Sequence, residues 1–196
     1  MNARPASEFS RKELKSALSN GSLIVHLGPF SHRINGVNDH ILNFLQDTYR
    51  DVPVELTPSD VTDIHLNLQA PNVFRKYFRK QVTPNPGFQV PVVPLPLSMT
   101  SLAYEMGLNL SVALKCCRYV TVHAGVVADD DGAIIMSAES GSGKSTLTAA
   151  LIEQGYRLFS DEFALIGLND AALQPYPRPI SLKEGTIPIV RELAGP

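Results

Sequence analysis

The stretch A-I-I-M-S-A-E-S-G-S-G-K-S-T-L-T-A-A-L-I-E-Q-G-Y-R-L-F-S-D-E, residues 133–162, decides the fold. It begins with a short apolar run typical of a buried strand, continues with a loop rich in Gly and Ser, and then takes helical spacing. Gly155 stands where helix ends favour a left-handed residue, and a second apolar run follows it and ends in two carboxylates. This order predicts an α/β nucleotide-binding core.

The Gly- and Ser-rich loop matches most of the phosphate-binding pattern G-x-x-x-x-G-K-[ST]. Small residues let successive backbone N–H groups point at phosphate oxygens, Lys144 brings charge to the β- and γ-phosphates, and Ser145 offers a hydroxyl to Mg²⁺. Ala138 replaces the first glycine, at a cost of about 1 kcal/mol if the position needs a positive φ. We therefore predict a P-loop for ATP and Mg²⁺; the alternative is a chance turn before a helix. The predicted nucleotide-binding residues are Ala138, Glu139, Ser140, Gly141, Ser142, Gly143, Lys144, Ser145 and Thr146.

Asp161 and Glu162 follow an apolar strand one helix after this loop. In P-loop proteins a carboxylate at such a strand end can hold Mg²⁺, directly or through water, or orient the attacking nucleophile. The alternative is a pair of solvated carboxylates. We predict Ser145, Asp161 and Glu162 as magnesium ligands.

A cluster of prolines marks the predicted domain boundary. Five of the 15 prolines fall within residues 84–96, where they favour extended chain over a helix or a central strand. We therefore expect a small α+β segment of unknown role over residues 1–96 and the nucleotide-binding domain over residues 97–196.

Several elements can be predicted on either side of this boundary. Before it, we expect strands over residues 23–27 and 64–69, and a helix from Asn38 to about Tyr49. Residues 72–82 have partly helical spacing, but their proline-rich context favours extended chain. After the boundary, a helix is predicted from apolar residues at helical spacing: Leu102, Met106, Leu110, Ala113, Leu114 and Cys117. Asp129 to Gly132 form a predicted hairpin turn.

Residues 105–190 resemble the catalytic core of the HPr kinase/phosphorylase family, and most closely its HPr-kinase-related kinase A group. The matching segments are V-H-A-G-V-V (122–127), S-G-S-G-K-S-T (140–146), A-L-I-E-Q-G-Y-R-L-F-S-D-E (150–162) and R-P-I-S-L-K (178–183). The resemblance implies an ATP-dependent kinase that phosphorylates a hydroxyl, typically a protein serine.

The resemblance also implies roles for individual residues. Asp161 would activate the acceptor hydroxyl, and Glu162 stands in place of a second aspartate. His123 would lie near the phosphates, with a histidine satisfied inside a hairpin as the alternative. Arg178 and Lys183 could add positive charge near the nucleotide, with a structural turn as the alternative.

The family continues well past the acidic pair, whereas this chain ends about fifty residues after the loop. We therefore expect the C-terminal part of the core to be missing. Two other functions stay open: a nucleotide-binding regulatory or assembly module, and a plain NTPase without kinase activity. The expected partners are the nucleotide, an unknown protein or small-molecule hydroxyl acceptor, and, from the resemblance, a second copy in a homo-oligomer.

Charge and composition exclude other classes of protein. The formal net charge of −2 argues against nucleic acid as a partner, and no window is apolar enough to span a membrane. We therefore expect no membrane partner. Cys116 and Cys117 are adjacent and form no disulfide framework, so we expect a reducing, cytoplasmic location. Basic residues alternate with aromatic ones over residues 74–80, which we interpret as a solvated basic face with an apolar backing.

Overall fold

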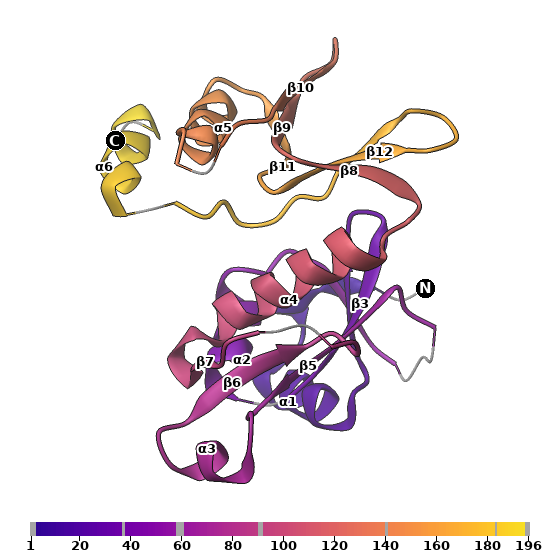
Figure 1. The fold of residues 1–196 in the computed structure, drawn as a ribbon, viewed down its shortest axis with the longest axis vertical. Coiled ribbons are helices and arrows are strands. Elements are labelled where there is room, and N and C mark those ends of the chain that lie inside the picture. Colours follow the sequence, from indigo (N-terminus) through magenta and orange to yellow (C-terminus); the bar gives the residue numbers. More distant parts are fainter. Residues whose placement is uncertain are drawn as a thin grey trace. The chain divides into compact units, whose positions relative to one another are not determined.

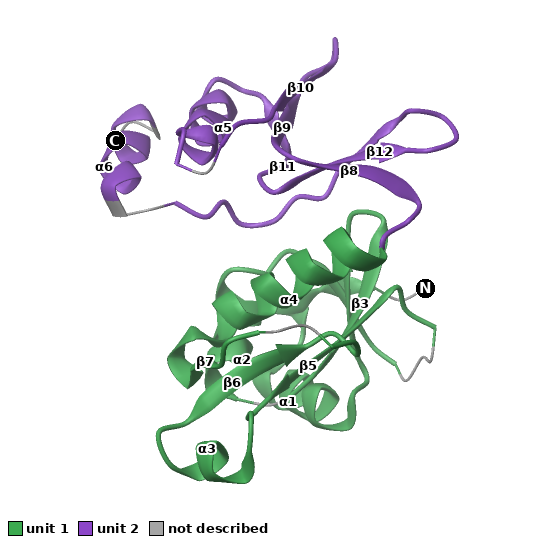
Figure 2. Ribbon diagram, in the orientation of Figure 1, with its two compact units in different colours: residues 1–115 green, residues 116–196 purple. Residues whose placement is uncertain are grey.

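A computed structural model describes residues 3–36, 38–57, 61–89, 92–139, 141–182 and 184–194. The chain divides into two compact units (Figure 2), unit 1 over residues 1–115 and unit 2 over residues 116–196. Helices and strands alternate in both units, so the fold is mixed α/β. Among the described residues, no helix has the length and apolar character that crossing a membrane requires.

Unit 1 is built on one mixed sheet with the strand order β1-β4-β2-β3-β5-β6-β7 (Figure 1). Its strands are β1 (Arg4–Pro5), β2 (Leu23–Leu27), β3 (Phe30–Asn35), β4 (Pro53–Leu56), β5 (Ile64–Gln69), β6 (Gln81–Asn85) and β7 (Leu95–Pro96). Only β3 and β5 pair in parallel; the other neighbouring pairs are antiparallel. The predicted strands over residues 23–27 and 64–69 are confirmed.

The helices of unit 1 begin at residues that satisfy their first N–H groups. Ser10 and Glu13 form a capping box, and the Asn38 side chain accepts a hydrogen bond from the Ile41 N–H at 3.1 Å. The predicted helix after Asn38 is therefore confirmed. The helical segments are η1 (Ala6–Glu8), α1 (Arg11–Asn20), α2 (Asp39–Asp47), α3 (Val73–Tyr77), η2 (Leu97–Met99) and α4 (Thr100–Lys115).

The division between the units lies after α4, not at the proline-rich segment where we placed it. A Cβ added to Gly107 would lie 2.5 Å from Leu66 Cδ1 and 3.0 Å from Pro84 Cβ, so the glycine lets α4 pack closely on the sheet. Pro84 itself belongs to β6 and pairs with Leu68. The prolines therefore lie within unit 1, and α4 completes its core.

The helix predicted after the boundary is confirmed as α4. Its buried face carries Tyr104, Gly107 and Leu108, whereas Leu102 and Leu114 are exposed. One local prediction in unit 1 is wrong. Residues 73–77 form the short helix α3 where we favoured extended chain. The Asn72 side chain accepts a hydrogen bond from the Arg75 N–H at 2.9 Å and so stabilises its first turn.

Unit 2 has two three-stranded antiparallel sheets, with the orders β10-β9-β11 and β13-β12-β8. Both β10 and β11 run antiparallel to β9, so they are parallel to each other, and α5 connects them. The elements are β8 (Tyr119–His123), β9 (Gly125–Ala128), β10 (Ala133–Met136), α5 (Lys144–Glu153), β11 (Arg157–Ser160), β12 (Phe163–Gly167), β13 (Leu173–Gln174), η3 (Glu184–Thr186) and α6 (Ile187–Ala194).

The predicted hairpin between β9 and β10 is confirmed. Asp129 Oδ1 accepts hydrogen bonds from the N–H groups of Asp131 and Gly132, each at 2.9 Å, and fixes the turn. One apolar cluster of unit 2 is formed by buried Ala124, Val126 and Ala164, and the partly buried Val122, Phe159 and Leu173 pack against it.

Candidate functional site

The loop between β10 and α5, residues 138–143, is called the glycine-rich loop below. Gly141 and Gly143 have φ values of 90° and 93°, a region that glycine enters at little cost, and Gly143 caps α5. In the described part of the chain, the non-glycine residues with positive φ are Arg79 and Ala171. Ala138 is not among them, so the backbone cost that we considered for this alanine does not arise.

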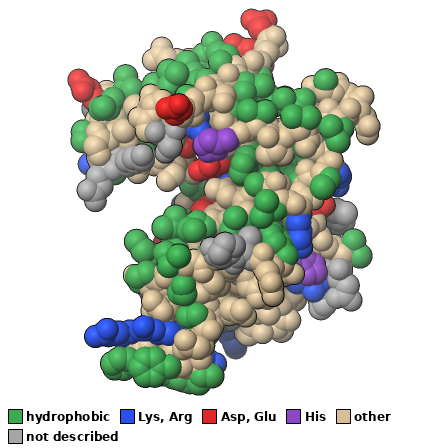
Figure 3. All heavy atoms as spheres, viewed as in Figure 1, with side chains coloured by type: hydrophobic (Ala, Val, Ile, Leu, Met, Phe, Trp, Pro, Cys, Tyr) green, Lys and Arg blue, Asp and Glu red, His purple; other side chains and the backbone are tan. Residues whose placement is uncertain are grey.

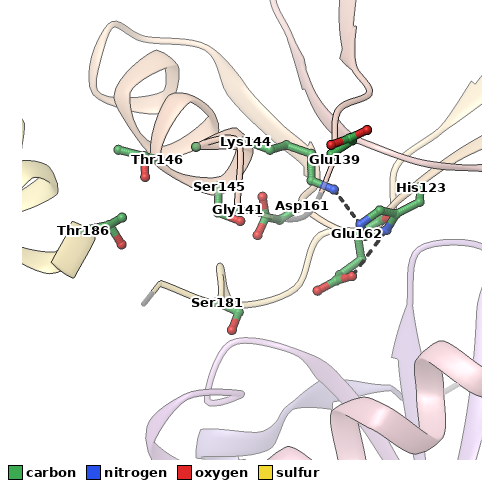
Figure 4. Close-up of a pocket in the computed structure, with 11 residues that line it drawn as sticks. His123, Glu139, Gly141, Lys144, Ser145, Thr146, Asp161, Glu162, Ser181 and Thr186 are labelled. Atoms are coloured by element: carbon green, nitrogen blue, oxygen red, sulfur yellow. Dashed lines mark hydrogen bonds and ion pairs between the residues drawn. The ribbon is translucent and has the colours of Figure 1, made fainter. Parts of the chain in front are cut away.

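The glycine-rich loop and the N-terminus of α5 form one wall of a pocket of about 340 Å³ in unit 2. The opposite wall comes from the end of β8, the turn after β11, and the segment that leads to η3 (Figure 4). The residues lining this pocket are His123, Glu139, Gly141, Gly143, Lys144, Ser145, Thr146, Asp161, Glu162, Ser181 and Thr186.

Lys144 and His123 point toward each other in this pocket (Figure 4), with Lys144 Nζ 2.7 Å from His123 Nε2. His123 Nδ1 lies 2.9 Å from the backbone oxygen of Glu162 and 3.7 Å from Glu162 Oε2. An ammonium group can only donate, so Nε2 accepts from Lys144, and Nδ1 carries the proton and donates to Glu162. His123 thus links Lys144 to Glu162 through its two ring nitrogens.

Asp161 is the buried member of the acidic pair, and its surroundings oppose ionisation. Burial raises the pKa of Asp161 above its ordinary value, and the nearby Glu162 carboxylate raises it further. A hydrogen bond with Ser145 and the charge of Lys144 lower this pKa in part. Its Oδ1 atom is buried without a hydrogen-bond partner. A cation that reached this oxygen would therefore stabilise the ionised carboxylate.

Magnesium suits the oxygen donors at this place. Mg²⁺ takes few protein ligands and completes its shell with water and phosphate oxygens. Two such ligands are available: the Ser145 hydroxyl at the start of α5 and the unpartnered Asp161 oxygen after β11. No group of three or more His, Cys, Asp or Glu side chains forms a metal site among the described residues. Ser145 and Asp161 therefore suit a Mg²⁺ ion whose remaining ligands are water and phosphate oxygens.

Other residues hold these side chains in position. Ser160 Oγ accepts hydrogen bonds from the N–H groups of Glu162 and Phe163, at 3.2 and 3.0 Å, and shapes the turn that carries the acidic pair. Thr148 Oγ1 donates to the Lys144 carbonyl at 3.0 Å. A Cβ on Gly125 would lie 2.5 Å from this same Thr148 Oγ1, so Gly125 lets α5 pack directly on β9.

Most residues that the sequence singled out line the same pocket. Ala138 and Ser142 are not among the lining residues, and Ser140 lies outside the described residues. Arg178 is buried with its guanidinium carbon 4.7 Å from the centre of the Tyr176 ring, and it does not line the pocket. Lys183 lies outside the described residues. The structure adds two hydroxyls, Ser181 and Thr186, which sequence reasoning missed because nothing in their neighbourhood signals proximity to the loop.

Comparison of the chain with protein-family models, with curated proteins and with solved structures finds no match in any of the three.

Proposed function

We propose that unit 2 binds ATP with Mg²⁺ and transfers the γ-phosphoryl group to a hydroxyl, as a P-loop kinase related to HPr kinase. One observation carries the proposal: a lysine and a serine at the start of a helix, preceded by a glycine-rich loop, share one pocket with a buried and incompletely bonded carboxylate. Phosphate binding, cation binding and an acceptor base then lie within a single pocket.

The phosphate groups would bind against the start of α5. The helix N-terminus carries partial positive charge, and the unpaired N–H groups of its first turn are donors for phosphate oxygens. The Lys144 ammonium has three protons, so it can keep its bond to His123 and donate the other two to phosphate. His123 therefore acts in this proposal as a positioning residue that directs Lys144.

The two carboxylates would have different tasks. The resemblance implies Asp161 as the residue that activates the acceptor, but its bond with Ser145 and its unpartnered Oδ1 favour a different role. Asp161 and Ser145 would hold Mg²⁺, which neutralises charge that develops on the phosphate oxygens. Glu162 is only half-buried and lies on the His123 side of the pocket, so an acceptor hydroxyl can reach it. As the acceptor oxygen bonds to the γ-phosphorus, the bond to the bridging oxygen of ADP breaks. The proton of the hydroxyl passes to Glu162.

The test is transfer of label from γ-labelled ATP to proteins and small molecules of a cell extract. Wild type should label an acceptor; Lys144→Ala should abolish this labelling, and Glu162→Gln should reduce it by about a hundredfold or more while ATP still binds. Glu153→Gln, at the exposed end of α5, is the matched control and should label normally.

Other results would exclude the kinase. Phosphate release to water that ignores added acceptors would indicate a plain NTPase. ATP binding without any turnover, in wild type as in Glu162→Gln, would indicate a regulatory nucleotide-binding module. Absence of ATP binding to wild type would refute the nucleotide site itself.

A further inference from the structure

A separate feature of unit 1 is the connection between β5 and β6, which carries α3. Residues 73–80, called the aromatic tip below, extend beyond the ends of these two strands (Figure 1). Val73, Phe74, Tyr77 and Phe78 are exposed to between 56% and 77%. We expected these side chains to back onto the protein; they face solvent instead. Four large apolar side chains exposed on eight residues require a physical explanation.

Basic groups surround the aromatic rings of the tip. The Phe74 and Phe78 rings lie 5.2 Å apart, and a cation lies close to each of three rings. Arg75 lies 5.8 Å from the Phe74 ring centre, Lys76 lies 5.7 Å from that of Tyr77, and Arg79 lies 5.9 Å from that of Phe78. The tip therefore presents apolar and positively charged groups together.

The charge of the tip is not balanced locally. Residues 64–104 contain no Asp or Glu and four basic residues, Arg75, Lys76, Arg79 and Lys80, although the whole chain has a net charge of −2. Among the described residues, none of these four forms an ion pair with a carboxylate. Their charge is therefore available to an external anion.

A polar pocket adjoins the tip. Lys76 and Lys80 line it together with Asp39, His40, Gln69 and Asn72, and its volume is about 940 Å³. The Asp39 carboxylate pairs with Arg11 at 2.8 Å, so it does not neutralise the two lysines. Two lysines beside amide groups are suited to a phosphate or another anionic group. The apolar side chains and this pocket are thus neighbours on unit 1. Figure 3 shows basic side chains directly beside an apolar group at the lower end of the molecule.

Composition led us to expect no membrane partner, but the exposed tip favours one: we propose that the aromatic tip docks unit 1 on an anionic lipid surface. Aromatic and aliphatic side chains would enter the boundary between headgroups and acyl chains, while the lysines and arginines bind headgroup phosphates. A lipid surface accounts for both the apolar and the basic side chains of the tip. A single-stranded nucleic acid would use the aromatic rings and leave Val73 unexplained. A typical protein interface buries about 800 Å² per partner, which eight residues on a protruding tip do not offer.

Vesicle sedimentation with the whole chain tests this proposal. The protein should pellet with vesicles of phosphatidylcholine and phosphatidylglycerol, and not with vesicles of phosphatidylcholine alone. Added salt should release it, because salt screens the attraction between exposed charges. The chain contains no Trp, so Tyr77→Trp supplies a single fluorescent reporter in the tip. Its emission should shift to shorter wavelength on the anionic vesicles if the tip enters them.

A pair of double variants separates the tip from net charge. Each basic residue near an anionic surface contributes roughly fivefold to binding. Lys76→Glu with Lys80→Glu should therefore weaken vesicle binding by at least about twenty-five-fold. Lys12→Glu with Lys15→Glu makes the same change in net charge on the exposed face of α1 and should retain most of the binding. Phe74→Ser with Phe78→Ser should remove the emission shift of Tyr77→Trp.

Three results would overturn the proposal. They are equal loss of binding in the two charge variants, equal sedimentation with both kinds of vesicle, and binding of a single-stranded oligonucleotide without any binding of vesicles. Equal loss would mean that net charge and not the tip drives binding, and equal sedimentation would mean that anionic headgroups are not recognised. Oligonucleotide binding alone would indicate a nucleic-acid partner. The tip lies in unit 1, so none of these results depends on whether unit 2 binds a nucleotide.

Discussion

Unit 1 and unit 2 differ in the size of their buried apolar cores. Unit 1 encloses a large core between its sheet and helices, with fully buried Leu14, Leu18, Leu23, Ile34, Ile41, Leu42, Leu45, Tyr49, Leu66 and Tyr104. In the described part of unit 2 fewer apolar side chains are buried, and four of them are alanines: Ala124, Val126, Val127, Ala128, Ala149, Phe163, Ala164, Leu165 and Tyr176. The candidate site lies in unit 2.

The difference in buried apolar side chains predicts which unit is more stable and which unit can admit a ligand. Apolar burial is the dominant favourable contribution to folding, so unit 1 should be the more stable unit. Sites that must admit ligands are commonly found in the less stable parts of a protein. A ligand that binds the folded state of unit 2 should therefore raise its stability and reduce the difference between the units.

The largest expected effect is that of a cavity in unit 1. Leu66 is 1% exposed and packs against α4 at Gly107, so Leu66→Ala should destabilise unit 1 by about 2–5 kcal/mol. The matched change in unit 2, Ile135→Ala on β10, should cost about 1 kcal/mol or less because the side chain is already 44% exposed. Urea unfolding followed by hydrogen exchange of each unit measures both. Equal losses of stability in Leu66→Ala and Ile135→Ala would contradict the inferred difference between the two units.

Next in size is the loss of ligand stabilisation in unit 2. ATP with Mg²⁺ at a hundred times its Kd should add about 2.7 kcal/mol to the free energy of unfolding of wild-type unit 2. Lys144→Ala removes the charge that meets the phosphates and should abolish this gain. Thermal unfolding with and without ATP and Mg²⁺ measures it. A full gain in Lys144→Ala would place the nucleotide elsewhere.

A smaller effect should come from the buried carboxylate. Because burial raises the pKa of Asp161, the folded state disfavours its ionised form. Its contribution to stability is present below the unfolded pKa and is lost as the pH rises through the raised folded pKa. Asp161→Asn should therefore raise the Tm of the ligand-free protein at neutral pH and leave it unchanged in acid. It should also remove the effect of Mg²⁺ on ATP binding.

The Tm of both proteins, recorded from acidic to neutral pH, checks this sign. Asp131→Asn, in the exposed turn after β9, is the control and should show no such pH-dependent difference. A lower Tm for Asp161→Asn at neutral pH would mean that the carboxylate is stabilised by partners, contrary to the burial argument.

The smallest effect should come from the histidine beside the lysine. His123→Ala removes the acceptor that directs Lys144 and leaves the ammonium in place. ATP affinity should fall by about three- to tenfold, the value of one hydrogen bond, and less than in Lys144→Ala. Titration calorimetry measures the difference. An unchanged affinity would show that His123 does not position Lys144.

Sequence predicted those parts of the fold that depend on neighbours along the chain. The cap at Asn38, the turn at Asp129 and the order of strand, loop and helix around Lys144 follow from local patterns, and the structure contains all three. The boundary after α4 was missed because it depends on a long-range contact, in which Gly107 packs against Leu66 and Pro84. Helical spacing alone cannot show that Gly107, and not Leu102 or Leu114, faces the core.

Prediction of the candidate site from the sequence was limited in the same way. Its members around Lys144 and Asp161 were identified from spacing, whereas the link from His123 to both Lys144 and Glu162 requires β8 and β12 to pair. Ser181 and Thr186 reach the pocket only through the path of the chain after β13. Such residues carry no signal in their own neighbourhood.

Hydrogen exchange in the presence and absence of ATP and Mg²⁺ tests whether unit 2 binds the nucleotide at the glycine-rich loop. We expect slower exchange in residues 141–148 and 160–163 of unit 2, with no change in the core strands of unit 1 and no protection in Lys144→Ala. Unchanged exchange around the glycine-rich loop, or protection confined to unit 1, would contradict this expectation.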